Sequence, residues 1–268
     1  MTDKSSKVIL RENDLHPKKR FGQNFLIDKN ILNKIAFAPN ATSEDVFFEF
    51  GPGTGALTDY LINIAKKIYA VEFYKDMVSV LLEKFKGNNK IEIINYDATE
   101  ILLKDYYEKE KQEFIIMGNL PYNVAAHIIF NIIENNIDYV KECYFMVQKE
   151  VAERLIEKNN SKNYSILTVL TDLFFEKSLL FDVKPTSFYP PPRIMSSIVK
   201  FKKTDKYMKS VKNFTLLKQV VKDAFSQRRK MLRNNLKDYK CLDKIINLNL
   251  RAENLTIQDF INITNFIV

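Results

Sequence analysis

A cluster of glycines constrains the fold of this chain more than any other feature. Three of its six glycines, Gly51, Gly53 and Gly55, lie within five residues, between an apolar run at 46–50 and a helix-like stretch at 56–67. Glycine adopts conformations closed to other residues and lets a ligand approach the bare main chain. The pattern therefore predicts a strand, a tight turn and a helix N-terminus around a binding site, since a plain turn would need only one glycine.

Apolar periodicity extends this prediction along the chain. Strands are predicted at 46–50, 68–72, 91–95, 114–117 and 142–147, and helices at 56–67, 74–86 and 124–134. Such alternation predicts an α/β fold with a mostly parallel sheet covered on both faces. Two more strands, at 179–183 and 194–201, flank a segment that holds four of the eight prolines, which favours an extended loop.

After residue 203 the strand signals stop. Helices are predicted at 214–225, 230–236 and 256–266, the last with Thr256 as its N-cap. This change predicts a boundary between an α/β domain, residues 1–203, and a small all-helical domain, residues 204–268.

The positive charge is concentrated in the second part of the chain. Residues 202–240 contain 13 Lys and Arg against three Asp, a charge of +10 that exceeds the +8 of the whole chain. Such a block favours a polyanionic partner. The plainer alternative, a solvated lysine-rich surface, fits the same composition.

Composition excludes or disfavours several other classes of protein. No apolar run reaches the roughly 18 residues of a membrane span, and the N-terminal residues lack the apolar core of a secretory signal. The two Cys and two His are far apart, which disfavours disulfides and a zinc site. We expect a cytoplasmic, monomeric protein with no metal and no membrane partner.

The glycine spacing narrows the kind of ligand. It is G-x-G-x-G rather than the dinucleotide pattern G-x-G-x-x-G, and no G-K-[ST] follows as in a P-loop. With Glu49 the loop reads E-x-G-x-G-x-G, which resembles motif I of Rossmann-like S-adenosylmethionine (SAM) methyltransferases. The resemblance implies SAM as cofactor, bound at a loop that includes Gly51 and Gly53.

Two acids follow the next two predicted strands. Glu72 lies 21 residues after Gly51, a position from which a carboxylate in this fold accepts hydrogen bonds from both ribose hydroxyls. Asp97, after the third strand, is expected beside the adenine of the cofactor. The alternatives are a solvated strand end for Glu72 and an Asx turn for Asp97.

The fourth predicted strand opens into Asn119-Leu120-Pro121-Tyr122, which resembles the [DNS]-P-P-[YFW] signature of amino-methyltransferases in its N-L-P-Y form. The Asn119 side-chain oxygen and the Leu120 carbonyl can accept the two N–H bonds of an adenine amine and aim its lone pair at the methyl group. Pro121 fixes the turn, and the Tyr122 ring can stack on the base. By itself the tetrapeptide fits an ordinary strand-exit turn equally well.

From about residue 16 to the last predicted helix, the chain resembles the small-subunit rRNA adenine dimethyltransferases, the KsgA family. The matching segments are KKRFGQNFL at 18–26, GPGTGALT at 51–58, NLPYN at 119–123, QKEVAERL at 148–155, FYPPPR at 188–193 and FSQRRKMLRNNL at 225–236. The resemblance implies SAM contacts from Asn24, Leu26, Gly51, Glu72, Asp97 and Asn119, and an adenine contact from Tyr122. It further implies dimethylation of two adjacent adenines in a hairpin loop near the 3′ end of 16S rRNA, within the immature small subunit.

The basic residues of two of these segments are expected to bind RNA: Lys18, Lys19, Arg20, Arg228, Arg229, Lys230 and Arg233. The last four are predicted on one helix, where they could instead pair with the α/β domain. The sequence departs from the family at 124–127, where Val-Ala-Ala-His replaces a run with hydroxyl groups, which puts fine substrate positioning in doubt. His127 is expected to pack on the apolar face of its helix rather than act as a base.

Three other functions share some of these features. An Erm-like methyltransferase of large-subunit rRNA has similar glycine and N-L-P-Y motifs, but the 188–193 and 225–236 segments argue against it. A non-catalytic nucleic-acid-binding factor on the same fold would not need the intact SAM and N-L-P-Y residues. Methylation of naked DNA is disfavoured by the small helical domain.

Overall fold

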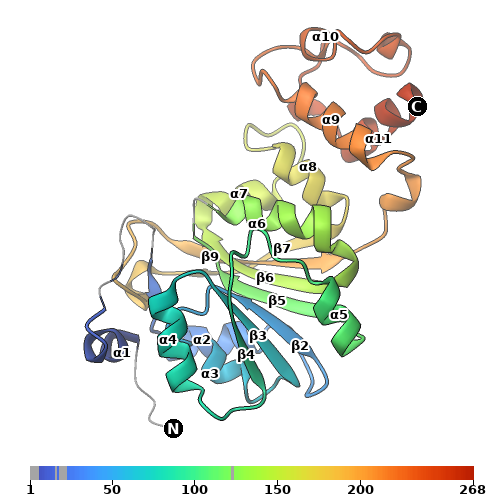
Figure 1. The fold of residues 1–268 in the computed structure, drawn as a ribbon. Coiled ribbons are helices and arrows are strands. Elements are labelled where there is room, and N and C mark those ends of the chain that lie inside the picture. The colour runs from blue at the N-terminus through green and yellow to red at the C-terminus, as the bar shows by residue number, and fades with distance from the viewer. Residues whose placement is uncertain (1–5, 16, 18–22, 122–123) are drawn as a thin grey trace. The chain divides into compact units, whose positions relative to one another are not determined.

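A computed structural model of the chain describes residues 6–15, 17, 23–121 and 124–268 (Figure 1). The chain forms two compact units. The first comprises residues 1–152 and 178–201, and the second residues 153–177 and 202–268. Residues 153–177 thus belong with the C-terminal helices, whereas the sequence placed them in the α/β domain. The difference arises because these residues include helix α8 (Ile166–Asp172), which packs on helix α9 (Phe214–Ala224). Just after α8, the ring of Phe174 lies 5.3 Å from that of Phe214, measured between centroids.

A seven-stranded sheet of order β4-β3-β2-β5-β6-β9-β7 is the framework of the first unit. Its strands are β2 (Val46–Phe50), β3 (Lys67–Glu72), β4 (Ile91–Asn95), β5 (Phe114–Asn119), β6 (Val140–Gln148), β7 (Phe175–Val183) and β9 (Ser196–Lys203). Strands β2 to β6 pair in parallel, as the alternating pattern predicts. Their carboxyl ends therefore lie along one edge of the sheet, where a parallel α/β fold binds its ligands.

Helices cover both faces of this sheet, because side chains alternate along each strand. On one face Phe47 packs with Leu32 of α2 (Lys29–Ala36) and Leu61 of α3 (Thr58–Leu61). On the other face the rings of Phe48 and Tyr69 stack with their centroids 5.0 Å apart, and both contact the ring of Tyr106 in α5 (Lys104–Glu110). The remaining helices of this unit are α1 (Ser6–Glu12), α4 (Lys75–Lys84), α5 (Lys104–Glu110), α6 (Ala125–Asn131) and the start of α7 (Lys149–Ile156).

A separate two-stranded sheet joins distant parts of the first unit. Strand β1 (Phe25–Leu26) pairs antiparallel with β8 (Phe188–Tyr189), and the Ile27 N–H donates to the Ser187 carbonyl at 2.9 Å. The Ser187 hydroxyl also donates to Asp28, whose carboxylate caps the N-terminus of α2. The described end of the family-like segment at 18–26 is thereby paired with the start of the segment at 188–193.

The second unit is helical, as predicted for the C-terminal residues. It contains α8, α9, α10 (Leu232–Asn235) and α11 (Ile257–Ile267). The predicted N-cap is confirmed, since the Thr256 hydroxyl accepts from the Asp259 N–H while the Asp259 carboxylate accepts from the Thr256 N–H. Helix α11 packs on α9, with Phe260 stacked on Phe225 at 6.1 Å.

Two helix predictions were too long. The helix predicted at 56–67 keeps only Thr58–Leu61, because the chain then tightens into turns whose Ile62 and Ala65 carbonyls accept from the Lys90 ammonium group. The helix predicted from residue 230 begins only at Leu232. Across the part of the chain that the structure describes, no helix is both long and apolar enough for a bilayer.

Candidate active site

The glycine loop after β2 has the predicted form. Gly51, Gly53 and Gly55 all adopt positive φ angles, of 70°, 57° and 73°. A Cβ atom on Gly53 would lie 2.9 Å from the Phe25 ring of β1, so a larger residue there would displace that ring. The loop needs its glycines both for its backbone angles and for its contact with the N-terminal strand.

Glu72, at the end of β3, is tied to this loop. Its carboxylate accepts hydrogen bonds from the backbone N–H of Gly53 at 3.0 Å and of Tyr74 at 2.9 Å. Only 4% of Glu72 is exposed, and burial raises its pKa while these backbone bonds oppose the rise. A carboxylate has about four acceptor positions, so these backbone bonds do not use all of them.

Glu49, also in the loop motif, is a second buried acid. The Thr58 hydroxyl donates to its carboxylate at 2.6 Å, and burial raises its pKa to about 7. Sequence reasoning noted Glu49 in the motif without assigning it a role. In the structure it joins the end of β2 to the first turn of α3.

A cavity of about 360 Å³, here called the first cavity, lies at the carboxyl ends of these strands. Its lining includes nearly all the residues predicted to bind cofactor or substrate: Asn24, Leu26, Gly51, Gly53, Glu72, Asp97, Asn119, Leu120 and Pro121. Such a volume suits a ligand of nucleoside size. The remaining predicted residue, Tyr122, lies outside the described residues.

The first cavity also has lining residues that the sequence prediction missed. The rings of Phe73 and Tyr96 are 60% and 47% exposed and lie next in sequence to Glu72 and Asp97. An aromatic residue directly beside each of two predicted ligand-binding acids was a signal in the sequence that could have been used. Ser6 of α1 lines the cavity as well, and its hydroxyl accepts from Thr54 of the glycine loop at 2.7 Å.

Asp97 combines the two alternatives that the sequence left open. Its Oδ1 accepts from the Thr99 N–H at 2.8 Å and from the Thr99 hydroxyl at 2.7 Å, which is an Asx-type turn. It nevertheless lines the first cavity. The turn fixes the carboxylate at the end of β4, so a structural role and a binding role are compatible.

Asn119, the last residue of β5, is oriented by the N-terminal segment. Its side-chain nitrogen donates to the Asn24 carbonyl at 3.0 Å, which leaves the side-chain oxygen as an acceptor. The Leu120 N–H donates to the Met146 carbonyl at 3.0 Å, and the Pro121 carbonyl accepts from Val124 and Ala125. Two acceptors at the cavity are thus left by the tetrapeptide, since no described group donates to the Leu120 carbonyl.

The prediction that His127 packs on the apolar face of its helix was wrong. This residue of α6 is exposed and is not part of the cavity lining. Its helix buries Ala125, Ile128 and Ile129 instead, because those positions point to the sheet. Among the described residues, no group of three or more His, Cys, Asp or Glu side chains could hold a metal ion.

The predicted RNA-binding residues are placed differently from the expectation. Arg228, Arg229 and Lys230 precede α10 in a turn, so they do not share a helix with Arg233. Arg228 donates to the carbonyls of Lys162 and Tyr164, the latter at 3.2 Å, within the second unit. The expected helix fails because Asn235 of α10 instead donates to the Ala224 carbonyl at the end of α9, which folds the chain into a tight turn. Lys18, Lys19 and Arg20 lie outside the described residues.

The sheet order, the glycine loop, the acid at the end of β3 and the tetrapeptide after β5 define a Rossmann-like SAM-dependent methyltransferase fold. The family model described as ribosomal RNA adenine dimethylase matches residues 15–268. The chain belongs to this family and is a methyltransferase.

Named relatives and solved structures agree with this assignment. The chain is 37% identical over 257 residues to proteins named ribosomal RNA small subunit methyltransferase A from Francisella tularensis subsp. novicida (strain U112) and subsp. tularensis (strain WY96-3418), covering 93% of this chain and 97% of each relative. A dimethyladenosine transferase from Plasmodium falciparum superposes with a TM-score of 0.72 at 27% identity, covering 89% of this chain and 95% of that one. The 23S rRNA methyltransferase ErmE, at a TM-score of 0.67 and 20% identity over 90% of this chain and 98% of its own, shares the fold.

Proposed function

We propose that this protein transfers methyl groups from SAM to the N6 amines of two adjacent adenines in a hairpin loop near the 3′ end of 16S rRNA, during assembly of the small subunit in the cytoplasm. The observation that carries the proposal is the bond from Asn119 to Asn24, which presents the Asn119 oxygen to the cavity that Glu72 and the glycine loop also line. The names of the relatives support the choice of the small subunit.

The residues of the first cavity fit SAM. The ribose and adenine of SAM carry hydroxyl and amine donors, and the cavity offers the carboxylates of Glu72 and Asp97 as acceptors. The half-exposed rings of Phe73 and Tyr96 offer apolar faces for a planar base. When bound, SAM supplies an electrophilic methyl group on a sulfonium.

The tetrapeptide after β5 would hold the adenine amine. Its lone pair is delocalised into the ring, so the amine is a weak nucleophile until it is made pyramidal. Hydrogen bonds from the two N–H groups to the Asn119 side-chain oxygen and the Leu120 carbonyl favour that geometry. Methylation converts the amine to an ammonium, whose acidic proton leaves to solvent without a general base.

The second unit would bind the RNA. Its basic stretch carries more positive charge than the whole chain, and Arg229, Lys230 and Arg233 are exposed. Cations in this arrangement suit a phosphate backbone. Arg228 is assigned chiefly to the structure of this unit, because it donates to two backbone carbonyls.

A methyl-transfer assay tests the proposal. Labelled SAM is incubated with immature small subunits, large subunits and DNA in parallel, and the modified nucleosides are identified by mass spectrometry. We expect dimethyladenosine in the small subunits alone. Labelling of large subunits instead would favour an ErmE-like function, and the absence of labelling in every substrate would favour a non-catalytic binding factor.

A further inference from the structure

The second unit contains a cavity of about 390 Å³, here called the second cavity, that shares no residue with the first. All of its lining residues belong to the second unit, from the end of α7, the α8–β7 turn, residues 204–207 and the start of α11. Its size falls within the range of ligand sites in proteins. The methyl-transfer mechanism gives this cavity no role.

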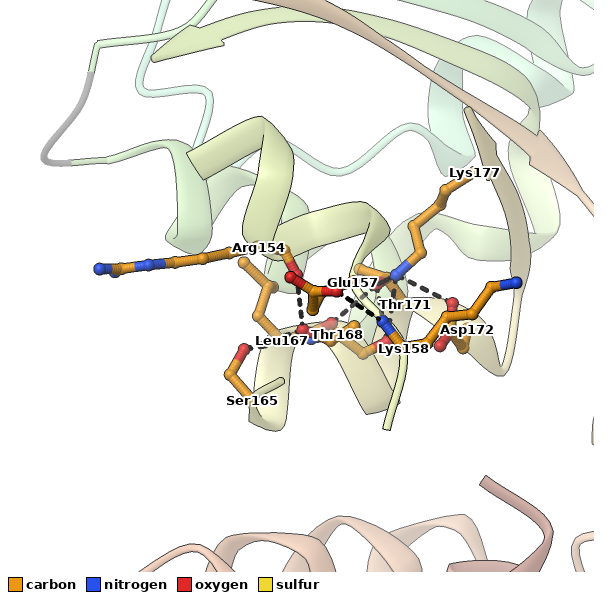
Figure 2. A network of polar contacts seen from close by, with 9 residues as sticks. All are labelled: Arg154, Glu157, Lys158, Ser165, Leu167, Thr168, Thr171, Asp172 and Lys177. Carbon is orange, nitrogen blue, oxygen red and sulfur yellow. Dashed lines mark hydrogen bonds and ion pairs between the residues drawn. The ribbon is translucent and has the colours of Figure 1, made fainter. Parts of the chain in front are cut away.

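A buried ion pair forms one wall of the second cavity. The Lys177 ammonium group, on a side chain only 3% exposed, donates to Asp172 at 2.9 Å, to the Thr171 hydroxyl at 2.6 Å and to the Thr168 carbonyl at 3.2 Å (Figure 2). These contacts use its three N–H donors, so Lys177 has none left for an anionic ligand. The other Asp172 oxygen has no partner within the described residues, and this side chain is 33% exposed and lines the cavity.

Tyr164 provides a second polar group. It is 2% exposed and lines the cavity, and its hydroxyl has no hydrogen-bond partner in the described part of the chain. Burial raises the pKa of Tyr164, and the charges of Asp172 and Asp259 add to the rise, so the phenol stays neutral and can donate. A neutral tyrosine hydroxyl without a protein partner can donate one hydrogen bond to a ligand. At this wall of the cavity, Tyr164 therefore offers a donor and Asp172 an acceptor to a ligand.

Charge and shape restrict that ligand further. The lining includes three cations, Lys158, Lys177 and Lys206, and three anions, Glu157, Asp172 and Glu176, so it carries no net charge and favours a neutral group. It also includes the rings of Tyr164, Phe175 and Tyr207. A neutral, planar group with both donors and acceptors describes a nucleobase, and unpaired RNA bases bind to aromatic rings in this way.

We propose that the second cavity receives a single unpaired base of the RNA substrate, one that carries an amine beside an acceptor ring nitrogen, as cytosine and adenine do. The amine donates to Asp172, the ring nitrogen accepts from Tyr164, and the exposed ammonium groups of Lys158 and Lys206 lie near the sugar–phosphate chain. The inference rests on the proposed function in that it takes the ligand from RNA.

Methyl NMR of the full-length chain separates the two cavities. Ile156 and Ile257 line the second cavity, whereas Ile35 and Ile128 line the first, so labelled isoleucine δ1 methyl groups report on each. With SAM present, CMP is expected to shift Ile156 and Ile257 in a saturable manner. UMP has a carbonyl in place of the amine, and ribose 5-phosphate has no base, so both are expected to bind much more weakly.

A conservative variant tests the contact itself. Tyr164→Phe removes only the unpaired hydroxyl and keeps the ring, so the fold is preserved and CMP affinity should fall about five-fold. Tyr239→Phe is the matched control, because its hydroxyl bonds Asp223 and the residue does not line the cavity. Its CMP affinity should equal that of the unmodified chain.

Three results would overturn the inference. The first is no shift of Ile156 and Ile257 with CMP up to about 10 mM, a concentration that would reveal a millimolar Kd. The others are equal shifts with UMP or ribose 5-phosphate, and an unchanged CMP affinity in Tyr164→Phe. Methyl transfer is measured separately. Intact methyl transfer without CMP binding would refute this inference alone, and CMP binding without methyl transfer would refute the proposed function alone.

Discussion

In the first cavity the carboxylate of Glu72 is held by two backbone N–H groups, those of Gly53 and Tyr74, whereas in the second cavity that of Asp172 is held by the ammonium group of Lys177. A backbone anchor is built from the main chain itself and survives most side-chain changes. A side-chain anchor depends on one partner, and removal of that partner leaves a buried charge uncompensated. The two cavities should therefore respond differently to mutation.

The largest effect is expected at the reacting group of the first cavity. In the proposed function the Asn119 oxygen accepts a hydrogen bond that strengthens as the adenine amine reacts. Asn119→Ala removes this acceptor, so methyl transfer should fall roughly 10²- to 10³-fold. Both methylations should slow, while binding to small subunits changes little. Initial rates with labelled SAM measure this loss, with Asn63→Ala, an exposed asparagine outside the cavity, as control. A similar loss in Asn63→Ala would remove the assignment.

The ion pair between Lys177 and Asp172 in the second cavity can be removed by one substitution. Lys177→Met leaves the Asp172 carboxylate without its cation, and the free energy of unfolding should fall by about 3 kcal/mol, the lower part of the range because Asp172 is partly exposed. Denaturant unfolding measures this change, and SAM affinity of the folded protein should stay constant. Lys66→Met, which breaks the more exposed pair with Glu110, should cost about 1 kcal/mol or less. Equal losses in the two variants would contradict the comparison.

Glu49 is a buried acid whose direct partner is a neutral hydroxyl, and its ionisation should lower the free energy of unfolding. Its pKa is about 7 in the folded protein and 4.5 in the unfolded chain, so between these values the folded state binds more protons. Stability should accordingly fall as the pH rises from 4.5 to 7, by up to about 3 kcal/mol. In Glu49→Gln, measured by denaturant unfolding at several pH values, this part of the pH dependence should be absent. A curve parallel to that of the unmodified chain would show that Glu49 does not titrate in this window.

The backbone-anchored carboxylate should matter for ligand affinity. In the proposed function Glu72 accepts two hydrogen bonds from the ribose, each on the order of 1.5 kcal/mol because the acceptor is charged. Glu72→Ala should therefore weaken the Kd for SAM roughly 100-fold. Calorimetric titration measures it, and Glu100→Ala, an exposed acid, is the control. CMP shifts at Ile156 should be unaffected. An unchanged SAM affinity in Glu72→Ala would contradict the proposal that Glu72 binds the ribose.

The smallest expected effect concerns the surface of the second unit. Reversing the charge of Arg229 and Lys230, two exposed cations, should reduce the slope of log affinity against log salt for small subunits by about 1.5. SAM affinity should not change. The double reversal of Lys86 and Lys104, exposed lysines of the first unit, is the control. If both double variants alter the slope equally, the effect is one of net charge rather than of a binding surface.

Sequence reasoning succeeded where local signals decide the structure. The strands of the sheet, the glycine loop and the clustering of Glu72, Asp97 and Asn119 were predictable, because parallel strands place their carboxyl ends at one edge. The roles of Arg228 and Lys177 were not, because their partners lie in other segments and no spacing marks them. The second cavity escaped detection for the same reason, since its lining is drawn from segments up to about 100 residues apart.

The pairing of β1 with β8 has a consequence for how the chain is made. Residues 25–26 leave the ribosome early, but their partners at 188–189 emerge only after the parallel strands β2 to β6 have been synthesised. Domains fold during synthesis as their residues become available. Strand β1, whose Phe25 ring lies beside Gly53 at the first cavity, can therefore pair with β8 only after residues 188–189 have been synthesised. A nascent chain released before residue 188 would have the glycine loop and Asn119 but an incomplete binding site.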